Sequence, residues 1–310
     1  MMSAVHFSIV IPAYNAAATL RSTVTSVQAQ TDQDFEIIII DDGSTDETLS
    51  IMLDLAAADV RIRAISKPNT GVSDTRNLAG KLAKGKLLAF LDADDQWHPA
   101  KLARHRVAHA FDPLLTASFA QVEFAPERGA EMAKARTFST FRAGCLDLAD
   151  VLVENAICTT SNLVVKRDVF HDLGGFDPTM RFAEDQELLA RIIADGGMIL
   201  GIEEPLVRYR MSADGLSCDF EAMLSHWRRF ASYWIEGSAL AQAEATYCRY
   251  LTRRALRAGA RMEVARSFAR RGLKADRAAF MAGGTRSFLT LGGAIAGGAL
   301  PASLRRAVFA

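Results

Sequence analysis

The sequence lacks the glycine-rich loops with which many nucleotide-binding proteins hold phosphate groups. Neither G-x-G-x-x-G nor G-x-x-x-x-G-K-[S/T] occurs in its 310 residues. This excludes a classical dinucleotide-binding loop and a P-loop. If the protein binds phosphates, we expect a metal ion to hold them.

Cysteine is scarce and is not arranged for metal binding or for disulfides. The four cysteines, at positions 145, 158, 218 and 248, are scattered along the chain. The N-terminus has no basic leader, and the apolar run after His6 stops at Pro12, so we expect no signal peptide. Reduced thiols and this N-terminus together predict a cytoplasmic protein.

Long uncharged runs are also rare, with a single exception near the C-terminus. Ser287–Leu304 carries no charge, but its eighteen residues include several glycines and Pro301. That length lies at the lower end of what a membrane-spanning helix requires. We therefore expect a surface or interfacial segment rather than a true span.

The chain has no net charge, but its charges are unevenly distributed. From Arg228 to the C-terminus there are fifteen Arg or Lys residues against four Asp or Glu, so this region carries +11 and the remainder −11. Seven arginines are expected on one helical face: Arg253, Arg254, Arg257, Arg261, Arg266, Arg270 and Arg271. A solvated surface explains such a face, and so does contact with anionic lipid headgroups at a membrane surface. No nucleic-acid-binding motif is present, so we expect no nucleic-acid partner.

The first hundred residues alternate between apolar strand patterns and helical patterns. Strands are expected at 7–11, 35–40, 60–65 and 87–91, and helices at 19–30, 45–58 and 71–84. This alternation predicts an α/β fold with a doubly wound, mostly parallel sheet. Ser44 and Glu47 predict a capping box for the second helix, and Gly85 is expected to end the third.

Unusual residues follow three of the predicted strands, where ligands bind in such sheets. Pro12–Asn15 follows the first strand, Asp41-Asp42 the second, and Asp92–Asp95 the fourth. Asp92 and Asp94 alternate along an extended chain and can point the same way. Neighbouring carboxylates repel unless a cation lies between them, and oxygen ligands suit Mg²⁺ or Mn²⁺. Taken alone, Asp92–Asp95 is explained equally well as a solvated acidic turn.

A second acidic position opens a helix in the middle of the chain. Glu184-Asp185 precedes a helical pattern that ends at Gly196-Gly197. A carboxylate in a first helical turn is stabilised by the helix dipole, which explains a simple cap. The same environment would keep Asp185 ionised as a general base. The chain is expected to divide into a domain of residues 1–218 and a basic helical region of residues 219–310.

Seven short motifs occur in the order known from one enzyme family. They are IVIPAYNA, IIDDGSTDET, PNTGVSDTRN, GKLLAFLDADD, GGFD, AEDQELLARI and VRYR. Over about residues 6–215 the chain resembles an inverting family 2 glycosyltransferase with the GT-A fold. The resemblance implies sugar transfer from a nucleoside-diphosphate sugar, most commonly a UDP-sugar, to a saccharide acceptor that can be lipid-linked. It also implies bacterial cell-surface polysaccharide synthesis, assisted by Mn²⁺ or Mg²⁺. The basic C-terminal region and Ser287–Leu304 add the expectation of peripheral contact with the inner face of the plasma membrane.

The resemblance assigns roles to individual residues. Pro12, Tyr14 and Asp42 match the nucleobase pocket, and Arg76 matches a basic residue near the nucleotide. Asp92 matches a position near the ribose and the metal, and Ala93, which follows it, matches a nucleotide-sugar-binding position. Asp94 matches the direct metal ligand and Asp185 the catalytic base.

One position departs from the family pattern. Many members have His two residues after the tyrosine of the YR motif, where this chain has Met211. A thioether is a poor ligand for a hard cation, so a third metal ligand from this segment is not expected. Tyr209 or Arg210 could compensate by contacting phosphate.

Two other classes of function compete with the glycosyltransferase. A nucleotidyltransferase would share the α/β sheet and acidic site, but usually has a basic, glycine-rich N-terminal loop that Pro12–Asn15 does not provide. A non-catalytic nucleotide-sugar-binding protein would not need the complete set of Asp92, Asp94 and Asp185.

Overall fold

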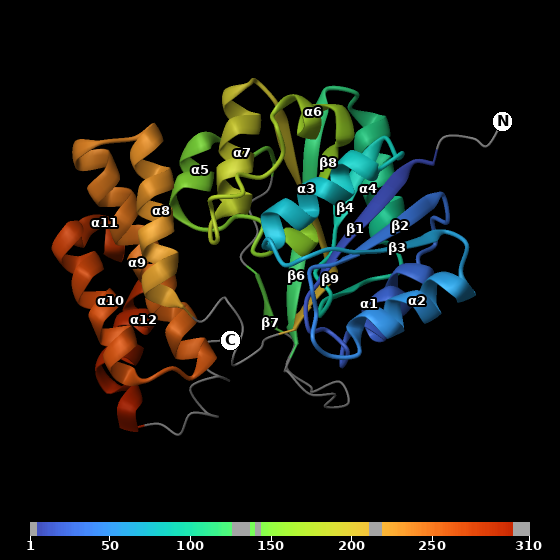
Figure 1. Cartoon of the computed structure of the whole chain (residues 1–310). Helices are drawn as coiled ribbons and strands as arrows, with labels where there is room; N and C mark the ends of the chain where they lie inside the picture. The colour runs from blue at the N-terminus through green and yellow to red at the C-terminus, as the bar shows by residue number, and fades with distance from the viewer. Residues whose placement is uncertain (1–4, 126–136, 140–143, 211–218, 300–310) are drawn as a thin grey trace. The chain divides into compact units, whose positions relative to one another are not determined.

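The computed structural model describes residues 5–125, 137–139, 144–210 and 219–299 (Figure 1). They fall into two compact units. The sheet unit contains the chain up to Leu148 together with Ala156–Arg210, and the helical unit contains Ala149–Asn155 and the C-terminal helices. The expected boundary at residue 218 lies outside the described residues and stays a prediction.

Four parallel strands form the first part of the sheet. They are β1 (Phe7–Ala13), β2 (Phe35–Asp41), β3 (Ile62–Ser66) and β4 (Leu87–Phe90), in the order β3-β2-β1-β4. The connecting helices are α1 (Leu20–Gln28), α2 (Thr48–Ala58) and α3 (Val72–Leu82). Ala13 lies beside Asp41, so the carboxyl ends of these two strands share one edge of the sheet. The predicted α/β fold with a doubly wound sheet is confirmed.

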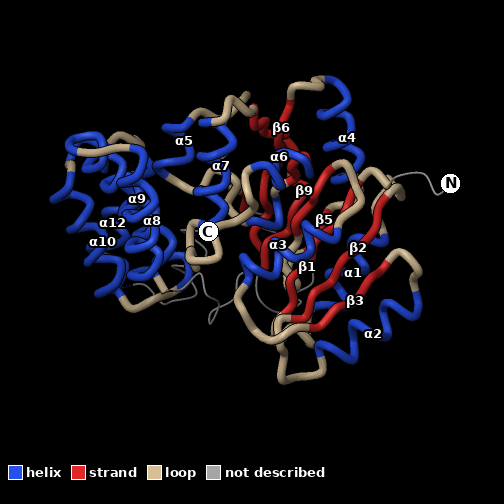
Figure 2. The backbone as a smooth tube through the Cα atoms, turned by 45° about the horizontal axis from the view of Figure 1, so that its top comes forward, coloured by secondary structure: helices blue, strands red, loops and turns tan. Residues whose placement is uncertain are grey.

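The second part of the sheet mixes parallel and antiparallel pairs, and Figure 2 shows the strands of the sheet in red. Its strands are β5 (Gln96–Trp97), β6 (Leu115–Ala125), β7 (Thr137–Phe138), β8 (Val164–Lys166) and β9 (Met198–Arg210). Strand β9 runs unbroken from Met198 to Arg210, but its pairing with β6 is interrupted by register shifts. The segment Asp92–Asp95 connects β4 to β5. Because β5 is paired with β9, both ends of this acidic segment are anchored in the sheet.

The remaining elements of the sheet unit are helical. They are α4 (Lys101–Phe111), the 3₁₀ turn η1 (Thr160–Asn162), α6 (Arg167–Asp172) and α7 (Glu184–Ala194). Of these, η1 and α7 bear directly on the acidic residues after β4.

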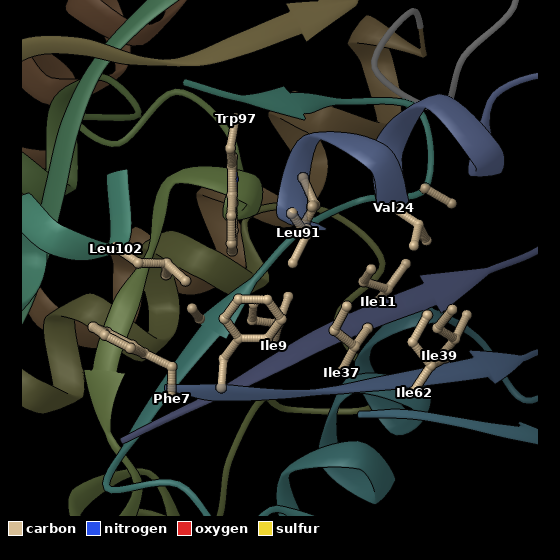
Figure 3. Packing of buried hydrophobic residues seen from close by; sticks show 14 of the residues in the cluster. Phe7, Ile9, Ile11, Val24, Ile37, Ile39, Ile62, Leu91, Trp97 and Leu102 are labelled. Carbon is tan, nitrogen blue, oxygen red and sulfur yellow. The ribbon is translucent and has the colours of Figure 1, made fainter. Parts of the chain in front are cut away.

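The main core lies on one face of the parallel strands. Phe7, Ile9 and Ile11 of β1 alternate toward this face and pack with Ile37 and Ile39 of β2 (Figure 3). On the same side lie Val24 of α1, Leu91, Trp97 and Leu102. Burial of these side chains supplies most of the free energy that fixes the sheet edge beside the acidic residues.

Two local expectations from the sequence are wrong. Helix α2 begins at Thr48 without a capping box. The Asp46 carboxylate accepts from the Thr48 N–H (3.0 Å), while Ser44 Oγ accepts from the Asn15 N–H (2.9 Å).

Helix α3 ends at Leu82, so Gly85 is not its capping residue. A Cβ at position 85 would instead lie 2.4 Å from the Ser8 nitrogen, so glycine allows the backbone to pass close to β1.

The helical unit is built from six helices within the described residues. They are α5 (Leu148–Val153), α8 (Phe220–Trp234), α9 (Gly237–Ala258), α10 (Met262–Ala275), α11 (Arg277–Met281) and α12 (Thr285–Ala296). The buried Trp227 stacks on Tyr247 with ring centroids 4.6 Å apart and donates to the Leu152 carbonyl (3.1 Å). Across the described residues, no helix combines the length and apolar character needed to cross a bilayer.

The close approach at Gly85 yields a test of the fold. We expect Gly85→Ala to destabilise the protein by about 1–3 kcal/mol, because the added methyl overlaps backbone atoms of Phe7 and Ser8 that cannot rotate away. Denaturant unfolding of the purified variant measures this loss. Gly292→Ala is the control, since a Cβ there meets nothing within 4 Å and alanine favours the helix. Equal stability of the two variants would contradict the assignment.

Candidate active site

A buried arginine joins the acidic residues after β4 to the start of α7. Arg76 lies on α3, and its Nη2 donates to Asp92 Oδ1 (2.6 Å) while its Nη1 donates to Glu184 Oε1 (2.9 Å). One guanidinium therefore separates Asp92 from Glu184. The structure brings the first turn of α7, which carries Asp185, to the edge of the sheet where Asp92 lies.

The surroundings of Arg76 show that it is a structural bridge. The residue is 3% exposed, and its guanidinium lies 5.5 Å from the ring centre of Phe176. Its Nε is buried without a hydrogen-bond partner. The sequence indicated Glu184 only as a candidate helix cap. Its ion-pair partner lies 108 positions earlier, and no local sequence pattern connects the two residues.

The first turn of α7 is both strained and acidic. Ala183, which precedes it, has φ 58°, a left-handed conformation that a residue with a Cβ rarely adopts. Burial and the charge of Asp185 raise the pKa of Glu184 to about 7, although Arg76 opposes this shift. Asp185 itself is 5% exposed, and its Oδ1 accepts from the Gln186 N–H (2.8 Å).

The three carboxylates after β4 have different surroundings. Asp92 is partly exposed, with its backbone N–H bonded to Ser161 Oγ (3.0 Å). Asp95 is buried and accepts from the Arg210 N–H (2.9 Å), and burial, Asp94 and Asp92 raise its pKa well above the usual value. Asp95 therefore ties the acidic turn to the end of β9 and does not face a ligand.

Asp94 and Asp92 could hold a divalent cation. Burial and the Asp92 charge raise the pKa of Asp94 to about 6, so the two carboxylates repel each other in the absence of a cation. The described residues contain no group of three or more His, Cys, Asp or Glu side chains able to hold a metal. Two carboxylates nevertheless fit Mg²⁺ or Mn²⁺, which commonly take one or two protein ligands and complete their shell with substrate phosphates and water.

Arg210 contributes positive charge next to Asp94. Its Nε donates to the Asp94 carbonyl (2.9 Å), and its charge partly opposes the rise in the pKa of the Asp94 carboxyl that burial and Asp92 cause. The sequence named Arg210 only as one of two residues that could compensate for Met211. Met211 lies outside the described residues.

Asp42 at the end of β2 organises the loop that precedes α3. Its carboxylate accepts from the N–H groups of Thr70 (2.9 Å) and Gly71 (3.0 Å) and from the Lys67 ammonium. Burial would raise the pKa of Asp42, but these donors outweigh it and lower the pKa. Lys67 was not identified from sequence, and its position before Pro68-Asn69 is the only signal that could have found it.

The other nucleotide-site candidates lie at the same edge of the sheet. Pro12 lies in β1 beside Ile40, and Tyr14 follows that strand with its side chain 54% exposed. Ala93 is buried, and its carbonyl accepts from Thr19 Oγ1 (2.8 Å) of the segment before α1. The exposed Tyr14 ring is therefore available to a ligand, whereas Ala93 holds the acidic turn in place.

The sequence matches the family described as glycosyl transferase family 2 over residues 8–174. It is 32% identical to an uncharacterized glycosyltransferase of Nostoc sp., over 66% of this chain and 64% of that protein. It is 27% identical to the putative teichuronic acid biosynthesis glycosyltransferase TuaG of Bacillus subtilis, over 78% of this chain and 92% of that protein.

Over a shorter stretch the sequence is similar to WfaP of Escherichia coli, which is named UDP-Glc:alpha-D-GlcNAc-diphosphoundecaprenol beta-1,3-glucosyltransferase. The identity is 44% over 31% of this chain and 38% of WfaP. The chain thus covers less than two thirds of the length of the Nostoc and E. coli relatives.

Solved structures share the backbone arrangement. The mannosyltransferase PcManGT of Pyrobaculum calidifontis, solved with GDP-Man and Mn²⁺, superposes with a TM-score of 0.63 over 99% of this chain and 85% of its own. The sequence identity is 17%, so this likeness bears on the fold alone. It confirms the predicted GT-A-type fold.

The bridge made by Arg76 can be tested through stability. We expect Arg76→Gln to lower the free energy of unfolding by about 3–5 kcal/mol, because it leaves Asp92 and Glu184 without their shared counter-charge. Arg21→Gln is a matched control, since its 2.7 Å pair with Asp54 is exposed and is expected to contribute about 0–1 kcal/mol. If denaturant unfolding gives equally small losses for both variants, Arg76 does not hold the site together.

Proposed function

Because the chain belongs to glycosyl transferase family 2, we propose that it transfers a sugar from a nucleoside-diphosphate sugar to a hydroxyl group of a saccharide acceptor. The observation that carries this proposal is the Arg76 bridge, which brings the acidic turn after β4 next to the first turn of α7. A transferase needs a charged donor site and a proton acceptor in one place. The bridge supports such an arrangement.

At the donor end, Tyr14, Pro12 and Asp42 are proposed to form the nucleobase pocket. The exposed ring of Tyr14 offers a stacking surface. The Asp42 carboxylate orders the 67–71 loop and remains the acceptor proposed for a base N–H, with Asp92 and Ala93 beside the ribose. UDP is the proposed nucleotide, in line with the UDP-Glc in the name of WfaP.

Asp94 and Asp92 are the proposed ligands of a Mn²⁺ or Mg²⁺ ion. The two repelling carboxylates support this assignment, and the related PcManGT was solved with Mn²⁺. When bound, the cation would offset the negative charge that develops on the diphosphate leaving group. Arg210, next to Asp94, adds a fixed positive charge on the same side of the site.

Asp185 is the proposed general base. A sugar hydroxyl is a weak nucleophile, so its proton must pass to a carboxylate as its oxygen attacks the anomeric carbon. Asp185 is the second residue of α7, in the first turn, where the helix dipole favours a negative charge. Attack opposite the leaving diphosphate in a single displacement inverts the anomeric configuration.

The acceptor is proposed to be a growing bacterial cell-surface polysaccharide. TuaG is named for teichuronic acid biosynthesis, and the name of WfaP includes a diphosphoundecaprenol-linked sugar. A lipid-linked acceptor would place the enzyme at the cytoplasmic face of the membrane. The basic C-terminal region is the proposed contact with that surface.

Replacing the proposed base separates catalysis from donor binding. We expect Asp185→Asn to lower kcat by about 10²–10⁴-fold, because no carboxylate takes the acceptor proton, while donor affinity stays unchanged. Turnover with a suitable nucleotide sugar and calorimetric donor titration measure the two effects. Asp195→Asn, just after the other end of α7, is the control and should keep full turnover. Near-normal turnover of the Asp185 variant would remove it from this role.

Replacing the proposed metal ligand should affect donor binding first. We expect donor titrations of the wild-type protein to show tighter binding with Mn²⁺ than with a chelator, because the cation bridges carboxylate and diphosphate. Asp94→Asn should abolish this difference, whereas Asp54→Asn, whose side chain is 67% exposed, should preserve it. An unchanged Mn²⁺ effect in the Asp94 variant would show that the cation binds elsewhere.

A further inference from the structure

Helix α12, labelled in Figure 1, buries small and polar residues and exposes large apolar ones, the reverse of a normal globular helix. Three of its four large apolar side chains face outward, since Phe288 is 67% exposed, Leu289 56% and Ile295 65%, while Leu291 is half-buried. Its buried face consists of Ser287, Thr290, Gly293 and Ala294. Helices of soluble domains normally bury their large apolar residues, and a continuous exposed apolar face usually marks an interaction surface.

Polar contacts hold the inward face of α12 in place. At one end of the helix, Arg249 Nη1 donates to Ser287 Oγ (3.4 Å), while the Thr290 hydroxyl is satisfied within α12 by donating to the Arg286 carbonyl (2.8 Å). At the other end, Arg266 donates from Nε to the Ala294 carbonyl (3.1 Å) and from Nη2 to the Ile295 carbonyl (3.2 Å). These contacts fix which side of the helix is buried, so its apolar side faces outward as a consequence of the packing.

Arg253, Arg257 and Arg286 lie near one another at the start of α12 and form the Arg253 cluster. Burial, Arg286 and Arg257 lower the pKa of Arg253 to about 10, and the Arg253 Nε is buried without a hydrogen-bond partner. Glu154 opposes this shift, but it also pairs with Arg249 (3.1 Å) and lies 3.8 Å from Arg286. Positive charge therefore exceeds negative charge at this end of the helix, and an anion binding there would relieve the repulsion.

We propose that α12 lies in the surface of an anionic bilayer, with Phe288, Leu289 and Ile295 among the lipid chains and the Arg253 cluster on lipid phosphates. An apolar helical face flanked by basic residues is the arrangement that binds such interfaces. The proposal deepens the membrane contact proposed above, on which it rests, by naming the element and residues that make it.

The charge of this region argues against a second copy of the chain as the occupant. No Asp or Glu occurs between Arg277 and the C-terminus. Two copies packed through α12 would bring their arginine clusters together, and Glu154 is already paired with Arg249 and Arg286, whereas an anionic lipid surface supplies further negative charge.

Co-sedimentation of the full chain with lipid vesicles tests the proposal. The wild-type protein should bind vesicles containing phosphatidylglycerol, bind pure phosphatidylcholine weakly, and be released by salt. Phe288→Ser/Ile295→Ser should weaken binding by roughly tenfold or more, because the apolar contribution is lost. Arg253→Gln should reduce binding to the anionic vesicles and reduce its salt dependence.

Controls separate this proposal from the catalytic one. Phe111→Ser removes an aromatic side chain that is 91% exposed on α4 of the sheet unit, and it should leave vesicle binding unchanged. Donor titration of the α12 variants should match the wild-type protein, so a failure of donor binding would concern the catalytic site alone.

Three results would overturn the proposal. Unchanged vesicle binding by the Phe288→Ser/Ile295→Ser variant would exclude α12 as the inserted element. Wild-type dimers that this variant dissociates, without vesicle binding, would assign the face to a second copy. Release from vesicles by inorganic phosphate, but not by chloride at equal ionic strength, would assign the arginines to free phosphate.

Discussion

The buried guanidinium of Arg76 is the interaction on which the site depends. It joins residues that lie 16 and 108 positions away in the sequence and belong to separate elements of the sheet unit. A buried ion pair is a weak source of stability, since desolvation offsets much of its attraction, but removal of one partner leaves an uncompensated charge. Any fold that moved α7 away from β4 would create such a charge. The bridge therefore specifies the relative position of the two acidic segments.

Carboxylates that repel each other and a strained backbone residue lie close to this bridge. The pKa of Asp94 is raised to about 6 and that of Glu184 to about 7, in each case first by burial and then by a neighbouring carboxylate. Ala183 adds a left-handed backbone conformation beside them. Arrangements that cost stability persist where function requires them. The proposed function uses these acidic groups to hold a cation with the diphosphate donor and to accept the proton of the acceptor.

Much of the fold could be predicted because strong local signals specify it. The strands after which Asp42 and Asp92 lie are continuous apolar runs, and parallel topology alone brings their ends to one edge. The Arg76–Glu184 pair could not be predicted, since neither residue has a local pattern that names the other. Gly85 was misassigned because a close backbone approach and a helix end use the same residue type. The buried face of α12 could not be predicted either, because hydrophobic periodicity favours burial of Phe288 and Leu289. In the structure, the contacts of Arg249 and Arg266 hold the opposite face inward.

The most direct test of the account is a crystal structure of the Asp185→Asn variant with Mn²⁺ and an intact nucleotide sugar. The account predicts Mn²⁺ on the Asp94 carboxylate and the diphosphate, with the anomeric carbon facing the first turn of α7. A donor bound away from the carboxyl ends of β1, β2 and β4, or a sugar directed away from position 185, would contradict it.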